Sequence, residues 1–165
     1  MNQLLRFLAV SVGLLPAAAL GADLRITVEG MRASTGTVLI GLYDGRTSFD
    51  RAIALSGKEG FLNDLERFAG AGLRAGRGRS ASFVFANLPH GDYAVILFHD
   101  ENGNGKLDKN FWGVPTEPYG FSNDAQGFLG PPAFKDATLS IDGDRTISIK
   151  LVFHEGGFVA ERDKP

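Results

Sequence analysis

Apolar and polar residues alternate with a period of two in several separate segments of the chain, at 24–28, 38–42, 83–85, 139–141 and 147–153. This period is typical of β-strands that bury one face and expose the other. Residues that favour turns separate the segments, as in Ser34-Thr35-Gly36 and Asp142-Gly143-Asp144. Short strands joined by such turns, without a regular alternation of strands and helices, predict an all-β fold, and more specifically an antiparallel β-sandwich.

Residues 93–98 are apolar at every position, so they predict a central strand that is covered on both faces. Two segments could cover its outer face. The first is a short helix near 57–69, indicated by apolar residues at helical spacing and by Ser56 and Glu59, which resemble a capping box. The second is a long loop over 111–134, rich in aromatic residues, proline and glycine. Residues 70–79, rich in glycine and arginine, are predicted to be a mobile loop.

The N-terminus reads as a secretory signal peptide over residues 1–22. Arg6 precedes an apolar run at 7–15, and small residues follow up to a predicted cleavage site near Gly21 or Ala22. An uncleaved anchor is the alternative, but the run is shorter than the roughly 20 residues that span a bilayer. We therefore expect a periplasmic or secreted protein with one domain over 23–153, a flexible tail over 154–165 and no transmembrane segment after cleavage.

Composition narrows the possible functions. The chain carries 17 basic and 19 acidic residues, a formal net charge of -2, which gives no electrostatic case for binding nucleic acid or an anionic membrane surface. It contains no cysteine, so neither disulfides nor thiol nucleophiles are available. There is also no Gly-x-Ser-x-Gly or His-Glu-x-x-His motif.

One loop near the middle of the chain has the oxygen spacing of a calcium site. Counting from its first aspartate, donors fall at positions 1, 3, 5, 7 (through a carbonyl) and 9, with a glycine at position 6. These residues are Asp100, Asn102, Asn104, Lys106, Asp108 and Gly105. Position 12, normally a bidentate glutamate, is Phe111, so we expect Glu117 to fold back into the gap. With few anionic ligands the affinity should be weak, on the order of 10⁻⁴ M. A metal-free Asn/Gly connection is the alternative.

The aromatic loop offers a second candidate site. Trp112, Tyr119, Phe121 and Asn123 could line a pocket for a sugar or another ring-shaped ligand, although such residues also form structural lids. A hydrolase acting in this pocket would need the carboxylates of Glu117 and Asp124 to converge on a substrate.

Five segments of the chain carry a resemblance to a known family. They are 85–95 (FANLPHGDYAV), 99–108 (HDENGNGKLD), 113–117 (GVPTE), 119–123 (YGFSN) and 130–134 (GPPAF). Together they resemble the bacterial exported family catalogued as domain of unknown function 2141. The resemblance extends from about Leu24 to Phe153 and implies an exported single β-domain, without implying an activity. The Leu-Pro-x-Gly-x-Tyr turn at 88–93 also resembles prealbumin-like sandwiches, within a prealbumin-like or Ig-like class.

Together these observations predict an exported, non-enzymatic β-sandwich that serves as a calcium-stabilised binding or envelope-associated module, with a protein or carbohydrate partner in the envelope. The two alternatives are a periplasmic hydrolase and a metal-free structural interaction domain.

Overall fold

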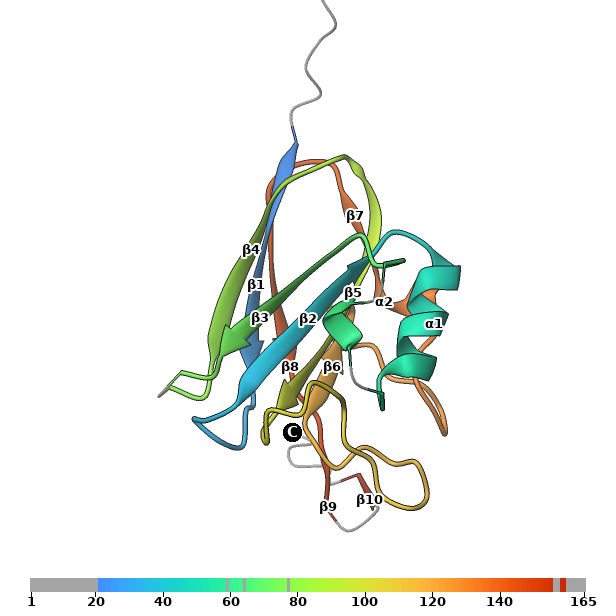
Figure 1. Cartoon of the computed structure of the whole chain (residues 1–165). Helices are drawn as coiled ribbons and strands as arrows, with labels where there is room; N and C mark the ends of the chain where they lie inside the picture. The colour runs from blue at the N-terminus through green and yellow to red at the C-terminus, as the bar shows by residue number, and fades with distance from the viewer. Residues whose placement is uncertain (1–20, 59, 64, 77, 156–157, 160–165) are drawn as a thin grey trace, which may run out of the picture.

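The computed structural model describes residues 21–58, 60–63, 65–76, 78–155 and 158–159 of the chain (Figure 1). The predicted signal peptide lies outside these residues except for its last two positions. The strands and helices, in chain order, are β1 (Ala22–Glu29), β2 (Thr37–Tyr43), α1 (Arg46–Leu55), the 3₁₀ turn η1 (Phe61–Asn63), β3 (Ala69–Arg74), β4 (Ala81–Leu88), β5 (Gly91–Asp100), β6 (Tyr119–Phe121), the 3₁₀ turn η2 (Ser122–Asp124), α2 (Phe134–Ala137), β7 (Thr138–Ile141), β8 (Arg145–Lys150), β9 (His154–Glu155) and β10 (Phe158–Val159).

The described residues are mostly β, as the alternating pattern predicts. One sheet has the strand order β4-β1-β8, and the larger sheet has the order β3-β2-β5-β6, with β7 also paired to β5. β5 is the central strand of the larger sheet. One of its edges pairs with β2 from Ala94 to Asp100, and its other edge pairs first with β7 and then with β6.

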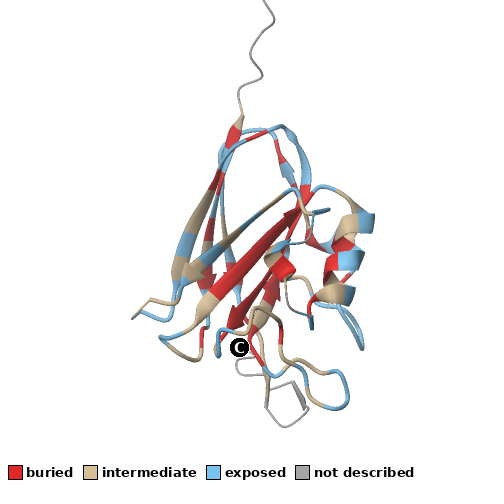
Figure 2. Cartoon of the chain, in the orientation of Figure 1, coloured by how far each residue is buried: buried red, intermediate tan, exposed pale blue. Residues whose placement is uncertain are grey.

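Side chains from both sheets meet in one hydrophobic core. Figure 1 shows how the two sheets are arranged, and Figure 2 marks the buried residues of their strands in red. β1 contributes every second residue to this core, β2 contributes Val38, Ile40 and Leu42, and β5 contributes Val95 and Leu97. The alternation in the sequence therefore predicts which face of each of these strands is buried.

The opposite face of the larger sheet is covered by a second core, because the alternate residues of β5 are apolar as well. Ile96 and Phe98 pack there against α1, η1 and α2. α1 turns Phe49 and Ala52 inward, and the Phe61 ring meets the Phe98 ring at a centroid distance of 4.9 Å. The predicted helix near 57–69 is wrong in its position: the helix is α1, which ends at Leu55 before that segment begins, and Ser56 is its C-cap residue rather than an N-cap.

Glycines explain why the described residues of 57–69 form only the short 3₁₀ turn η1 and not the predicted helix. Gly57 follows the C-cap directly, and Gly60 has a φ of +93°, which lies outside the helical region. The segment that follows, predicted to be a mobile loop, forms β3 instead and pairs antiparallel with β2 from Thr37↔Arg74 to Leu42↔Ala69. Half-buried and exposed residues alternate along β3, but most of them are alanine and glycine and not the bulky residues typical of strands. The strand pattern in the sequence is therefore weak.

One further expectation needs correction. The sheets are not purely antiparallel, because β1 pairs with β8 in parallel, from Leu24↔Arg145 to Glu29↔Lys150. Within the predicted tail, β9 and β10 pair with each other. Among the described residues, no helix has the length and apolar character that crossing a membrane requires.

Candidate metal site at the end of strand β5

The predicted calcium loop begins where β5 ends. Asp100, the last residue of β5, is only 3% exposed. Its carboxylate accepts backbone N–H groups from Gly103 (2.7 Å), Asn104 (3.1 Å) and Gly105 (2.8 Å). Gly103 and Gly105 have φ values of +77° and +75°, which L side chains rarely adopt. A buried carboxylate and two glycines therefore set the tight path of the loop.

The next three predicted ligands bond to one another across the loop. Asn102 Nδ2 donates to Asp108 Oδ2 at 2.6 Å, and Asn104 Nδ2 donates to both carboxylate oxygens of Asp108 at 3.0 and 3.1 Å. The amide oxygens of Asn102 and Asn104 accept the N–H groups of Asn104 and Lys106, each at 3.1 Å. The two asparagines thus turn nitrogen, not oxygen, toward Asp108.

Glu117 reaches the loop from nine residues further along the chain, as the vacant twelfth position suggests. It is 4% exposed, and its two carboxylate oxygens accept the N–H of Glu101 (2.8 Å) and the N–H of Asp108 (3.0 Å). Burial raises the pKa of Glu117, and the nearby carboxylates of Asp108 and Asp100 raise it further, whereas the two backbone hydrogen bonds act to lower it. One buried carboxylate therefore joins both ends of the loop.

A hairpin between Asp108 and Glu117 delivers this side chain. Thr116 N donates to Asp108 O at 2.8 Å, and Lys109 and Pro115 form an isolated antiparallel β-bridge. At the tip, Asn110 N donates to Val114 O at 2.9 Å, and the Asn110 Oδ1 atom accepts the N–H groups of Trp112 and Val114.

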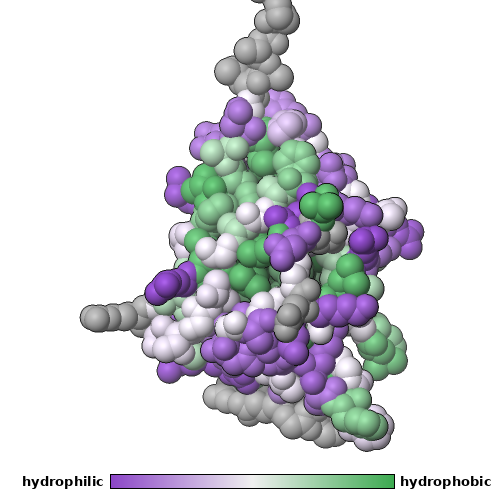
Figure 3. Space-filling view, in the orientation of Figure 1, coloured by the Kyte–Doolittle hydropathy of each residue, from purple (hydrophilic) through white to green (hydrophobic). Residues whose placement is uncertain are grey.

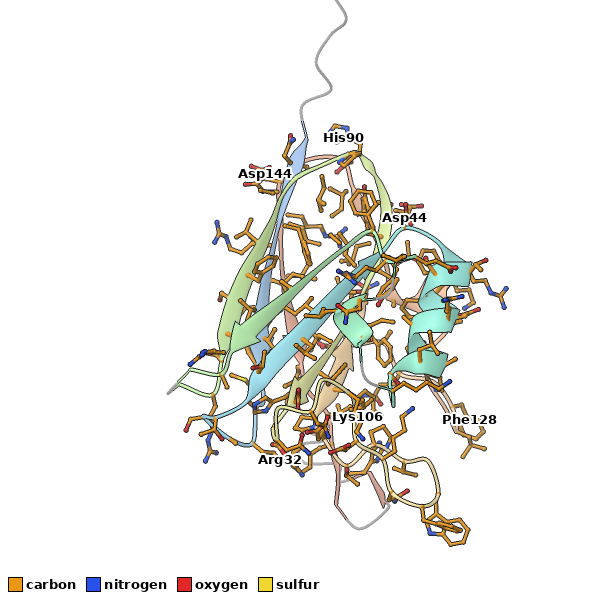
Figure 4. The ribbon with its side chains drawn as sticks, viewed as in Figure 1. Arg32, Asp44, His90, Lys106, Phe128 and Asp144 are labelled. Carbon is orange, nitrogen blue, oxygen red and sulfur yellow. The ribbon has the colours of Figure 1, made fainter. Side chains whose placement is uncertain are left out.

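Arg32, His99 and Glu101 form a polar contact beside the loop that sequence reasoning did not anticipate. Arg32 Nη2 lies 2.5 Å from Glu101 Oε2, and it also donates to the Thr116 carbonyl at 2.9 Å. His99 is fully buried, with its Nε2 2.7 Å from Thr35 O and its Nδ1 3.7 Å from Glu101 Oε1. Figure 4 places Arg32 and Lys106 at the same lower end of the molecule.

The loop is not arranged as a finished metal cage. Among the described residues, no group of three or more His, Cys, Asp or Glu side chains is positioned to hold a metal ion. Asp100, Asp108 and Glu117 do approach closely enough for the first two carboxylates to raise the pKa of the third. The donor types fit a hard cation, but the asparagine oxygens would have to turn toward Asp108 before they could act as ligands.

The structure does not bring the four residues of the predicted aromatic pocket together around one cavity, although the Tyr119 and Phe121 rings contact each other with a centroid distance of 6.0 Å. Trp112 is 82% exposed and contacts Phe111 with a ring-centroid distance of 5.3 Å. Tyr119 stacks on His154, and its hydroxyl lies 3.0 Å from His154 Nε2, while the Phe121 ring is buried. Asn123 donates to the carbonyls of Asp136 and Thr138.

A surface hollow of about 550 Å³ beside α1 is lined by other residues, among them Arg51, Leu55 and Phe61. None of the four predicted pocket residues lines it. The two carboxylates that a hydrolase would need also hold separate backbone partners: Asp124 accepts Lys150 N at 2.8 Å, and Glu117 accepts Glu101 N and Asp108 N.

The fold and the loop define a small all-β module with an acidic, glycine-shaped loop closed by a buried glutamate. The chain belongs to the bacterial family described as "uncharacterized protein conserved in bacteria", domain of unknown function 2141, whose model matches residues 26–149. The matched segment spans about three quarters of the chain, from β1 into β8. No curated protein and no solved structure matches it.

Proposed function

We propose that this protein is an exported, non-enzymatic binding module whose loop over residues 100–108, closed by Glu117, binds calcium and is stabilised by it. The observation that carries this proposal is Glu117. A carboxylate that is 4% exposed, close to Asp100 and Asp108, accepts two backbone N–H groups but forms no ion pair with a cationic side chain among the described residues. Excess negative charge at a buried place favours binding of a cation.

Chemistry of the donors supports calcium over other metals. Carboxylates, amide oxygens and the Lys106 carbonyl are hard oxygen donors, which calcium and magnesium prefer, and the loop contains neither cysteine nor histidine. Calcium tolerates irregular shells of six to eight oxygens, so waters can complete a site with few protein ligands. Magnesium requires a more regular octahedral shell.

The loop is linked to the rest of the domain at several points. Asp100 ends the central strand, Leu107 N donates to the Ser56 carbonyl at the end of α1 at 2.7 Å, and Glu117 leads into β6. A cation in the loop would therefore stabilise the end of the larger sheet, because any ligand that binds only the folded state raises its stability by mass action.

Calcium is expected to raise the melting temperature of the purified protein. With a dissociation constant on the order of 10⁻⁴ M, a hundredfold excess of calcium contributes about 2.7 kcal/mol. For a domain of this size that corresponds to a rise of about 5–10 °C, measured by differential scanning calorimetry with and without calcium. Asp108→Asn, which removes one charge and keeps the shape, should reduce the rise, whereas Asp142→Asn in the exposed turn between β7 and β8 should not.

A calcium response of the same size in Asp108→Asn and in the wild type would contradict the proposed site. The metal-free alternative has one observation in its favour. The Asp108 carboxylate already accepts hydrogen bonds from the side-chain amides of Asn102 and Asn104, so it has partners without a metal ion. Under that alternative, calcium leaves the melting temperature of every variant unchanged, and the loop serves only to shape the domain.

Export is the second testable part of the proposal. The sequence of residues 1–22 supports it, and β1 begins at Ala22, next to the predicted cleavage site. Mass spectrometry of the protein from its native cells is expected to show a mature chain that starts near Ala22 or Asp23. Intact Met1 on the protein in the membrane fraction would contradict cleavage.

A further inference from the structure

Exposed large apolar side chains are concentrated at two loop tips. Among the described residues, six large hydrophobic side chains are exposed, and four of them occupy two adjacent pairs: Phe111 (93%) with Trp112 (82%), and Phe128 (96%) with Leu129 (93%). We call these pairs the hairpin tip and the glycine tip. Figure 3 shows two apolar patches along the lower right margin of the molecule, and Figure 4 places Phe128 there.

Both tips are built so that their side chains point outward. The hairpin tip lies in the turn from Asn110 to Val114, whose backbone is held by the Asn110 side chain and by the Gly113 N to Asn110 O bond of 3.0 Å. The N–H groups of Asn110, Trp112, Gly113 and Val114 are thus bonded within the turn, which lowers the cost of moving it into an apolar medium. The glycine tip is equally tight, because a Cβ on Gly127 would collide with the carbonyl oxygen of Pro131.

The glycine tip also carries backbone strain. Leu129 has a φ of +58°, a region that a leucine adopts rarely and at a cost of about 1–3 kcal/mol. Such strain persists where the surrounding structure enforces it, and it is common at binding sites. Here the strained residue is Leu129, whose side chain is 93% exposed, and no contact of that side chain with the described residues accounts for the strain.

The surroundings of the tips distinguish between possible partners. Residues 110–115 and 125–133 contain no charged side chain. Lys109, at the base of the hairpin, extends beside Gly57, with Nζ 3.7 Å from the position of a Cβ there, and Lys58 is the next residue. Neither Lys58, Lys106 nor Lys109 takes part in any ion pair between described residues.

We propose that the hairpin tip and the glycine tip insert into the interfacial layer of a lipid membrane, with Lys109 and its neighbours at the level of the headgroup phosphates. Tryptophan and phenylalanine are favoured at that depth, and lysine stems extend readily toward phosphate. A protruding tip with apolar residues at its apex fits a deformable lipid surface, whereas a protein partner would need a matching hollow for each tip. Because the net charge of the chain is -2, apolar insertion rather than overall charge drives this binding.

The chain contains a single tryptophan, so Trp112 reports on its own environment. We expect its fluorescence emission to shift to shorter wavelength when the purified protein meets vesicles of phosphatidylethanolamine and phosphatidylglycerol. Brominated acyl chains should quench this emission, and the protein should sediment with the vesicles. Each effect should persist in a calcium chelator, because this inference rests on the exposed tips and not on the calcium loop.

Variants assign the binding to the tips. The double variant Phe128→Ser/Leu129→Ser keeps the reporter and should weaken vesicle binding by about tenfold or more, as should Phe111→Ser. Leu65→Ser, which changes another exposed apolar side chain (97% exposed), should bind as the wild type does. All variants carry the same N-terminus, so an uncleaved signal sequence would not produce these differences.

Three outcomes would overturn the inference. The first is no spectral shift and no sedimentation at any lipid concentration. The second is vesicle binding of equal strength in all variants, which would place the contact elsewhere on the chain. The third is a spectral shift that follows protein concentration without lipid, which would indicate contact between copies of this chain instead of a membrane.

Discussion

Leu97→Ala and Ile96→Ala are each expected to lower the free energy of unfolding by about 2–5 kcal/mol, the usual cost of removing a buried aliphatic side chain. The two residues are neighbours on β5 but point to opposite faces. Leu97 is fully buried in the core between the sheets, and Ile96 is 4% exposed in the core beneath α1 and η1. Urea denaturation at constant m-value measures both losses.

This pair of variants tests the two cores separately. Leu65→Ala is the matched control, because that side chain is 97% exposed and its loss should change stability by less than about 0.5 kcal/mol. A loss at Leu97 without a loss at Ile96 would mean that the helices do not cover the outer face of the larger sheet. Small changes at both positions would contradict the central place of β5.

Glu117→Gln is expected to lower the free energy of unfolding of the calcium-free protein by about 1–3 kcal/mol at low pH. Glu117 is protonated there, so both side chains are uncharged, and the loss comes from a backbone N–H that is left without an acceptor. Both oxygens of Glu117 accept a backbone N–H, from Glu101 and from Asp108. A glutamine offers one oxygen, so its amide nitrogen would face the second N–H. Glu29→Gln, on an exposed carboxylate of β1, is the control.

The pH dependence of this variant separates charge from hydrogen bonding. The folded-state pKa of Glu117 is raised, first by burial and then by the carboxylates of Asp108 and Asp100, so the folded protein holds this proton more tightly than the unfolded chain. Its contribution to stability is therefore fully present below the ordinary glutamate pKa and is lost as the pH rises through the raised value. We expect this decline in the wild type and not in Glu117→Gln, measured by urea denaturation in calcium-free buffers. Equal slopes in both proteins would contradict the raised pKa.

Residue size explains which parts of the fold the sequence predicts. β5 is apolar at each position from Tyr93 to Phe98, and that run correctly predicts a central strand buried on both faces. α1 buries only Phe49 and Ala52, which is a weaker pattern than the larger apolar residues over 57–69. β3 alternates alanine and leucine with glycine and arginine, so neither side has the bulky residues by which strands are usually recognised.

The candidate site shows a similar limit. Loop spacing and a vacant ligand position are local features that single out Glu117, and in the structure its carboxylate accepts backbone N–H groups from both ends of the loop. Its role as a metal ligand stays a prediction. Arg32 lies on the connection between β1 and β2, and nothing near it in the sequence indicates that it pairs with Glu101. The sequence does not predict the orientation of the Asn102 and Asn104 amides either, because a glycine-rich turn and a calcium loop use the same residue types.

The parallel pairing of β1 with β8 has a consequence for how the chain acquires its fold. β1 lies between β4 and β8, so the first strand of the domain is completed by one of the last, with Ile26 beside Ile147. A nascent or emerging chain that lacks β8 leaves one edge of β1 with unpaired backbone groups, which is a template for aggregation. Pairings between such distant segments also raise contact order and slow folding. This topology is suited to a chain that stays unfolded until its C-terminal strands are available, and any truncation before β8 should yield insoluble protein.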